Sequence, residues 1–246
     1  MAITSLLTLS AYFFGSIPTA YLLVWALRRK DIRTLGSRSV SASNAKEALG
    51  RWATAVIGVT DILKGAAPIW AAQYLDRSLA EQMTVGLAVL AGHNWSVFMS
   101  FRGGRGLTIV GGVLLAAARM ELLLFIIIGV FGFAFTGSVP IWLGLSAVLL
   151  PFWSFALGSE APLIWGNGIM VALVALKRLV GNWDPLPQRG RVRVLLNRLV
   201  LDRDTKDREA WLHREPPGEA APPTLASEFG SGPYGGPDEV WSQGDP

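Results

Sequence analysis

Apolar runs that are long enough to cross roughly 30 Å of hydrocarbon as helices recur along most of this chain. With 51% hydrophobic and only 16% charged residues, and a mean hydropathy of +0.40, the composition excludes an ordinary soluble domain. We therefore expect an all-α, polytopic integral membrane protein with about seven transmembrane helices. The seven runs cover residues 3–27, 52–75, 83–101, 107–118, 120–138, 140–158 and 162–180, of which 107–118 is short for a full crossing.

The lysines and arginines between these runs predict the topology. They crowd the first connection, between residues 28 and 51, and they mark the third connection at Arg102 and Arg105. Lys177 and Arg178 close the last run. The positive-inside rule then places the amino end outside and the carboxyl end in the cytoplasm, which requires an odd number of spans. The first run lacks a small-residue cleavage site and has a basic flank after it, so we expect it to stay in the membrane.

The composition changes abruptly after the last run, and this predicts three parts. Residues 1–181 form the transmembrane domain, and residues 182–215 form a basic amphipathic cytoplasmic segment. That segment either lies along an anionic leaflet or docks onto a protein partner. Residues 216–246 are rich in proline, glycine, serine and acidic residues, so we expect disorder there unless a partner orders them. The chain has no cysteine, which excludes disulfides and thiolate chemistry.

Two arginines stand among three glycines in the stretch Phe101-Arg102-Gly103-Gly104-Arg105-Gly106, between two apolar runs. Glycines allow backbone N–H groups to approach a phosphate, and the helix expected after Gly106 would favour an anion at its amino end. Arginine adds a permanently charged, forked donor. One interpretation is therefore an anion site for a phosphorylated ligand. The other is a short turn whose arginines contact only lipid headgroups.

The first basic connection also contains a run of hydroxyl and amide side chains, from Gly36 to Asn44. As a whole this loop can offer many hydrogen bonds to an anion, and we favour ligand contact for it. For single residues a structural role is the alternative, because Ser43 or Asn44 can cap a helix that starts at Ala45.

Ionisable groups also occur inside the apolar runs, where each needs a partner or a water-filled cavity. Asp61 and Lys64 are three residues apart, hence on one helix face, and we expect them to neutralise each other. Lys64 can also contribute to an anion pocket, and Gly65 permits close helix packing. His93 is either a packing residue or a donor to a substrate oxygen. No second histidine or carboxylate stands at metal-ligand spacing, so we expect no metal.

No Walker phosphate loop, zinc-protease helix, Gly-x-Ser-x-Gly elbow or His-x4-Asp pair occurs in the sequence. We therefore expect a substrate that arrives already activated and charged, with the protein supplying positioning and anion stabilisation.

Several of these motifs, in this order, resemble the bacterial membrane acyltransferases of the PlsY family, which transfer a fatty acyl group from acyl phosphate to glycerol 3-phosphate. The resemblance covers most of the membrane part. It rests on Gly15-Ser16-Ile17-Pro18, Asp31-Ile32-Arg33, Gly36-Ser37, Ala42-Ser43-Asn44, Asp61-Ile62-Leu63-Lys64-Gly65, Gly92-His93 and Phe101 to Gly106.

The resemblance implies a seven-helix fold in the bacterial inner membrane with its active site at the cytoplasmic face. It implies acyl phosphate and glycerol 3-phosphate as substrates and lysophosphatidate as product, without cofactor, metal, nucleic acid or acyl-enzyme. Ser37 and the glycine-rich loop inherit the phosphate-binding role, and we assign Ser37 and Arg105 as catalytic. The residues assigned to substrate binding are Ser43, Asn44, Lys64, His93, Gly103, Gly104 and Gly106.

The sequence departs from the family pattern at three places. Arg38, Ser39 and Ser41 replace a glycine, an asparagine and a glycine of the first motif, and Glu47 stands where the family has an arginine. The stretch 172–175 lacks the histidine and asparagine usual before the last basic pair. The alternative function is therefore a catalytically degenerate member that serves as an accessory, lipid-contacting subunit of a membrane complex, docked through its carboxyl tail.

Overall fold

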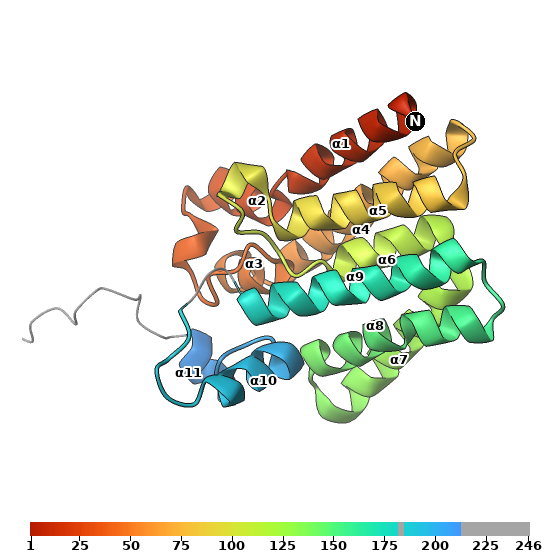
Figure 1. The fold of residues 1–246 in the computed structure, drawn as a ribbon. Helices are drawn as coiled ribbons and strands as arrows, with labels where there is room; N and C mark the ends of the chain where they lie inside the picture. The colour runs from red at the N-terminus through yellow and green to blue at the C-terminus, as the bar shows by residue number, and fades with distance from the viewer. Residues whose placement is uncertain (182–184, 213–246) are drawn as a thin grey trace, which may run out of the picture. The chain divides into compact units, whose positions relative to one another are not determined.

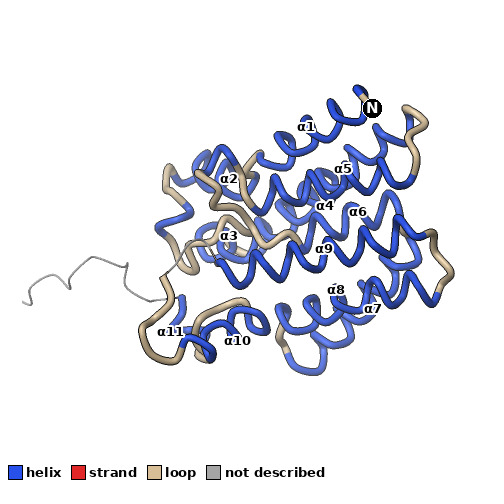
Figure 2. Tube along the Cα trace, in the orientation of Figure 1, coloured by secondary structure: helices blue, strands red, loops and turns tan. Residues whose placement is uncertain are grey.

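The computed structural model describes residues 1–181 and 185–212, and all regular structure in these two ranges is helical (Figure 2). The all-α prediction is confirmed. The expectation of disorder for 216–246 lies outside the described residues. The helices are α1 (Ala2–Ser16), α2 (Thr19–Arg28), α3 (Ala42–Leu49), α4 (Arg51–Tyr74), α5 (Leu79–Asn94), α6 (Leu107–Ala117), α7 (Arg119–Thr136), α8 (Val139–Ala156), α9 (Ala161–Val180), α10 (Arg191–Leu201) and α11 (Arg208–Leu212), with short 3-10 helices η1 (Ile32–Thr34) and η2 (Val97–Met99).

Five helical segments of the described chain are long and apolar enough to cross a membrane: α1 with α2, α4, α7, α8 and α9. The helix α6 is apolar but shorter, and α5 has 16 residues. These seven segments match the seven predicted runs in order. Large apolar side chains such as Phe131, Val148 and Phe155 are exposed on their outer faces, where lipid takes the place of water. The count of seven crossings and their direction remain predictions.

The first predicted run is broken rather than continuous. Helix α1 ends at Ser16 and α2 begins at Thr19, because Pro18 has no N–H to continue the helical ladder. The break leaves the carbonyl of Ile17 available to a partner outside the helix, and Lys64 Nζ donates to it at 2.9 Å. The broken helix therefore brings a backbone acceptor to the ionisable pair of α4.

Glycines set how closely the central helices pack. A Cβ added at Gly65 in α4 would lie 2.5 Å from the carbonyl oxygen of Ile109 in α6, and one added at Gly112 would overlap the carbonyl of Ile62. The close packing predicted at Gly65 is confirmed. The same kind of approach joins α1 to α5, where Gly92 faces the backbone of Tyr12. In Figure 1, α5 runs beside α6 and α9, and α9 packs on both α5 and α8.

Candidate active site

Lys64 is the centre of a buried polar cluster formed by α4, α5 and the break after α1. Its Nζ lies 3.2 Å from Asp61 Oδ1 and 3.4 Å from Thr19 Oγ1, in addition to its bond to the Ile17 carbonyl. Thr19 donates its own hydroxyl to Asp61 Oδ1 at 2.9 Å. The predicted neutralisation of Asp61 by Lys64 is confirmed. Sequence reasoning missed Thr19, because its position next to Asp61 depends on the break at Pro18.

Lys64 also determines which ring nitrogen of His93 carries the proton. Lys64 Nζ lies 3.3 Å from His93 Nδ1. An ammonium group can only donate, so Nδ1 accepts and the proton of the neutral imidazole lies on Nε2. A Cβ added at Gly104 would overlap Nε2, which shows that this N–H is directed at the glycine-rich loop. The geometry therefore fits a hydrogen-bond donor at that loop and not a base.

The glycine-rich loop lies directly against the end of α5. Gly104 donates its N–H to the carbonyl of His93 at 3.0 Å, so that amide is not free to bind a phosphate. A Cβ at Gly103 would overlap the same carbonyl, and one at Gly106 would lie 2.5 Å from Asn94 Oδ1. Gly106 adopts φ +79 as the residue before α6. The glycines therefore allow the loop to approach α5 closely, and the Gly104 N–H does not contribute to the predicted anion site.

Asn44 organises the loop that carries the serines. Its Oδ1 accepts from the Ser37 N–H at 3.0 Å, and its Nδ2 donates to the carbonyls of Ile32 and Ser39 at 3.0 and 2.9 Å. The side chain is buried. Asn44 thus shapes the loop with all of its amide groups. The expected cap at Ser43 or Asn44 is wrong, because α3 starts at Ala42 and Ser41 caps it by accepting from the Asn44 N–H at 3.4 Å.

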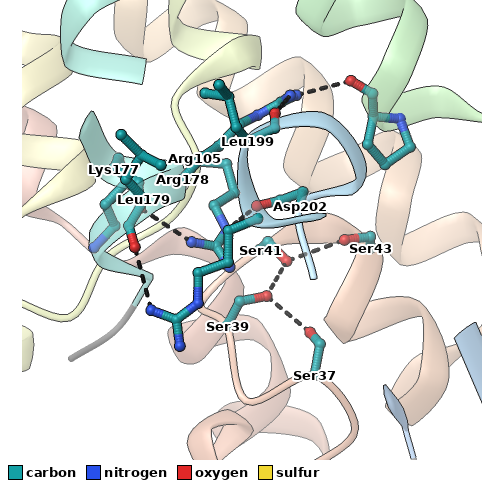
Figure 3. A network of polar contacts seen from close by, with 12 residues as sticks. Ser37, Ser39, Ser41, Ser43, Arg105, Lys177, Arg178, Leu179, Leu199 and Asp202 are labelled. Atoms are coloured by element: carbon teal, nitrogen blue, oxygen red, sulfur yellow. Dashed lines mark hydrogen bonds and ion pairs between the residues drawn. The ribbon is translucent and has the colours of Figure 1, made fainter. Parts of the chain in front are cut away.

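The four serines of this loop form a continuous chain of hydroxyls, drawn in Figure 3. Neighbouring Oγ atoms are 2.9 Å apart from Ser37 to Ser39, 2.7 Å from Ser39 to Ser41, and 3.1 Å from Ser41 to Ser43. Ser43 is exposed at one end and Ser39 is buried in the middle. Ser37 and Ser43 are therefore linked to each other.

The serine loop and the glycine-rich loop meet at one small pocket. A Cβ added at Gly104 would lie 3.0 Å from the carbonyl oxygen of Val40, which stands inside the serine run. Residues from both loops, from α4, from α5 and from the break after α1 line the pocket, among them Ile17, Thr19, Val40, Asp61, His93 and Gly104. The structure thus assembles segments that are far apart in sequence around one cavity.

Arg105 points to a different neighbour. Its Nε lies 2.9 Å from Asp202 Oδ1, and its Nη1 donates to the carbonyl of Lys177 at 3.3 Å (Figure 3). Asp202 follows α10 directly and adopts φ +56. Sequence reasoning missed Asp202, because nothing in the local pattern connects it with the glycine-rich loop. The carboxylate of Asp202 thus pairs with Arg105, the arginine that we expect to bind the substrate phosphate.

The remaining departures from the family pattern lie near the same loops. Glu47 is exposed on α3, and its Cγ would lie 3.8 Å from a Cβ added at Gly36. Lys177 and Arg178, after the stretch without histidine and asparagine, are buried; Lys177 Nζ lies 5.7 Å from the centroid of the Trp95 ring. The positive charge at this end of α9 is therefore held inside the protein.

A salt bridge outside the membrane helices orders the start of the first connection. Asp31 accepts from the Arg33 side chain at 2.6 to 3.0 Å and from its N–H at 2.8 Å. The hydrogen bonds from Arg33 hold the pKa of the Asp31 carboxyl below its ordinary value.

Comparison with known proteins assigns the chain to a family. A model described as "Glycerol-3-phosphate acyltransferase" matches residues 5–184. The chain belongs to the glycerol-3-phosphate acyltransferase family. It is 33% identical over 229 residues to glycerol-3-phosphate acyltransferase 5 of Dehalococcoides mccartyi, covering 89% of this chain and 97% of that protein. The glycerol-3-phosphate acyltransferase of Endomicrobium trichonymphae is 34% identical, covering 67% and 82%.

Solved structures agree with this assignment. PlsY, an integral membrane glycerol 3-phosphate acyltransferase, superposes in its glycerol 3-phosphate form with a TM-score of 0.67 at 25% identity, covering 71% of this chain and 88% of that chain. Its lysophosphatidic acid form gives a TM-score of 0.66 at 22% identity, covering 80% and 93%. With the apolar helices described above, this makes the present chain a multi-pass integral membrane protein of PlsY-like fold.

Proposed function

We propose that this protein transfers a fatty acyl group from acyl phosphate to glycerol 3-phosphate, giving lysophosphatidate and inorganic phosphate at the cytoplasmic face of a bacterial inner membrane. Family membership and the likeness to PlsY in its glycerol 3-phosphate form support the acceptor. One observation of the structure carries the proposal. The His93 ring is held by Lys64 at Nδ1, and its Nε2–H points to Gly104, where the serine loop meets the glycine-rich loop.

The proposed reaction needs little from the protein besides position and charge. A hydroxyl oxygen of glycerol 3-phosphate forms a bond to the acyl carbonyl carbon, and the bond from that carbon to the phosphate oxygen breaks. The phosphate leaves with the electron pair, and the hydroxyl proton passes to a phosphate oxygen. Because the leaving group is already good, orienting two anions next to each other is the main task. This fits a site whose described residues offer donors and cations.

Each predicted residue then has a role that its geometry allows. His93 Nε2–H donates to an oxygen of the acyl phosphate, and Lys64 holds that ring while adding positive charge next to Asp61. The serine hydroxyls rotate to donate to a phosphate at Ser37 or Ser43. Arg105 binds phosphate only after it exchanges Asp202 for the substrate.

Two observations favour the second candidate, a family member that binds phosphate without turnover and serves as an accessory subunit. Arg105 is already paired with Asp202, and Glu47 puts a negative charge where the family has a positive one. A lost charge-assisted contact at a reacting phosphate costs a few kcal/mol, and about 1.4 kcal/mol is a factor of ten in rate. The stable complex expected for such a subunit would survive mild detergent extraction.

The identity of the acyl donor is the direct test of the proposal. Purified protein in lipid nanodiscs would receive glycerol 3-phosphate with palmitoyl phosphate, or with palmitoyl coenzyme A in its place. We expect lysophosphatidate from palmitoyl phosphate alone. Product from the coenzyme A ester alone would refute the proposed donor, and no product from either would favour the accessory role.

A further inference from the structure

Helix α10 places two polar side chains, Asn197 and Arg198, against the protein. Asn197 and Arg198 are buried, and their side chains reach the loop that follows the helix. Arg198 Nε lies 2.6 Å from Asp204 Oδ1, and Asn197 Nδ2 donates to the Asp204 carbonyl at 3.0 Å. Val194, Leu195 and Leu201 of the same helix are half-buried, so the side of α10 that faces the protein carries both polar and apolar side chains.

The opposite side of α10 is apolar and exposed. Val192 is 71% exposed, Leu196 57% and Val200 47%. They recur every four residues and therefore form one stripe along the helix, with Leu199 beside it at 37%. None of the described residues covers this stripe, and four apolar side chains in a row need a cover other than water.

The rotation of α10 is fixed by contacts with the end of the transmembrane domain. Arg178 of α9 donates from Nη1 to the Leu199 carbonyl at 2.8 Å and from Nη2 to the Pro140 carbonyl of α8 at 2.9 Å. Arg198 in turn donates to the Leu179 carbonyl at 3.2 Å. Helix α10 packs on both α8 and α9. The stripe is thus held outward next to the start of α8 and the end of α9.

Three arginines flank the stripe. Arg189, Arg191 and Arg193 are all exposed, and Arg193 lies next to Val200 around the helix at 100° per residue. Carboxylates are missing from α10 itself, whose sequence is RVRVLLNRLVL. An apolar stripe with a basic border matches the boundary between acyl chains and anionic headgroups.

We propose that α10 is an interfacial helix that binds the anionic lipids of the protein's own bilayer, with Val192, Leu196 and Val200 among the acyl chains and the three arginines at the headgroups. The occupant is a lipid surface and not a protein, because α10 follows a membrane-spanning helix closely and its charge complements an anionic leaflet. This proposal goes beyond acyl transfer and does not depend on it.

The absence of native cysteine allows a site-specific test. Full-length Leu196→Cys would carry a bimane label, and the protein would be placed in nanodiscs that contain brominated phosphatidylglycerol or brominated phosphatidylcholine. Lys206→Cys, an exposed position in the loop after α10, is the matched control. Both side chains are exposed, so neither change disturbs the packing.

We expect bromine to quench the label at Leu196 several-fold more than the label at Lys206, and phosphatidylglycerol to quench it more than phosphatidylcholine. Replacing Arg189, Arg191 and Arg193 together by glutamine should remove the difference between the lipids and leave part of the quenching. Equal quenching at Leu196 and Lys206 would overturn the proposal and leave a protein partner as the cover. Equal quenching by the two lipids would overturn the anionic preference.

Discussion

Arg105 of the glycine-rich loop and Asp202 at the end of α10 form an ion pair at 2.9 Å between Nε and Oδ1. The pair joins a loop between two membrane helices to a segment that follows the last one. Both side chains are mostly buried, with 16% and 22% of their surface exposed. A carboxylate therefore stands where the proposed reaction brings a phosphate, and binding of substrate must compete with it.

Replacing Asp202 by asparagine removes the competing charge and keeps the shape of the side chain. We expect the KM for glycerol 3-phosphate to fall roughly two- to fivefold, as a partly exposed ion pair of about 0.4–1 kcal/mol implies. The rate at saturating substrate should not decrease. Asp76→Asn, in the exposed turn between α4 and α5, is the control and should change neither quantity. A raised KM in Asp202→Asn would mean that Asp202 positions Arg105 instead of competing for it.

Restoring the family's charge at Glu47 tests whether this departure limits activity. Glu47 is exposed and lies next to Gly36, so arginine can be accommodated there without repacking. We expect Glu47→Arg to raise kcat/KM for glycerol 3-phosphate about tenfold, by replacing repulsion of the phosphate with attraction. Glu47→Gln should give a smaller gain. An unchanged kcat/KM in both variants would show that residue 47 does not face the substrate.

Variants of the Asp61–Lys64 ion pair can distinguish an effect on stability from an effect on activity. Lys64→Met leaves the Asp61 carboxylate buried without its cation, which should cost about 3–5 kcal/mol. The double variant Asp61→Asn with Lys64→Met should recover most of the thermal stability in detergent. It should remain inactive, because His93 loses the group that fixes its ring. Recovery of activity together with stability would show that Lys64 is only structural.

Two adjacent glycines of α6 form a matched pair for the packing of α4 on α6. A Cβ at Gly112 would overlap the Ile62 carbonyl, whereas nothing lies within 4 Å of one at Gly111. Gly112→Ala should lower the free energy of unfolding by about 1–3 kcal/mol, and Gly111→Ala should raise it by about 0.4–1 kcal/mol. Thermal unfolding in detergent measures both. Equal effects would contradict the close approach of the two helices.

The lowered pKa of Asp31 predicts that the stability of the fold depends on pH in the acidic range. A carboxyl whose pKa is lower in the folded state stabilises the fold above its unfolded pKa, near 4. That contribution is lost as pH falls through the folded value. Asp31→Asn should therefore be less stable than the parent at pH 6, and the difference should shrink toward pH 3. A difference that is constant with pH would show that the charge on Asp31 is not what Arg33 stabilises.

Local spacing was enough to predict those parts of the site that lie within one element. The pairing of Asp61 with Lys64 follows from a separation of three residues in a helix, and Gly65 next to them predicts a close neighbour. The order of the membrane segments follows from the apolar runs. The apolar run alone predicts one continuous helix, whereas the missing N–H of Pro18 explains the break between α1 and α2.

Contacts between distant segments left no trace in the local sequence. The ion pair of Arg105 with Asp202 depends on where α10 docks, and the use of the Gly104 amide by His93 depends on the path of the loop. The cap at Ser41 was missed for a related reason, because three neighbouring residues are all good caps and only the loop geometry selects one. The roles of the site residues in substrate binding remain predictions.

Turnover by the purified chain is the most direct test of the central claim. Protein in anionic nanodiscs would be mixed with palmitoyl phosphate and glycerol 3-phosphate, and both lysophosphatidate and released phosphate would be measured, with His93→Ala as the comparison. We predict equal amounts of the two products from the parent chain and at least a tenfold slower rate from His93→Ala. Phosphate release without lysophosphatidate, or a rate that His93→Ala leaves unchanged, would contradict the account.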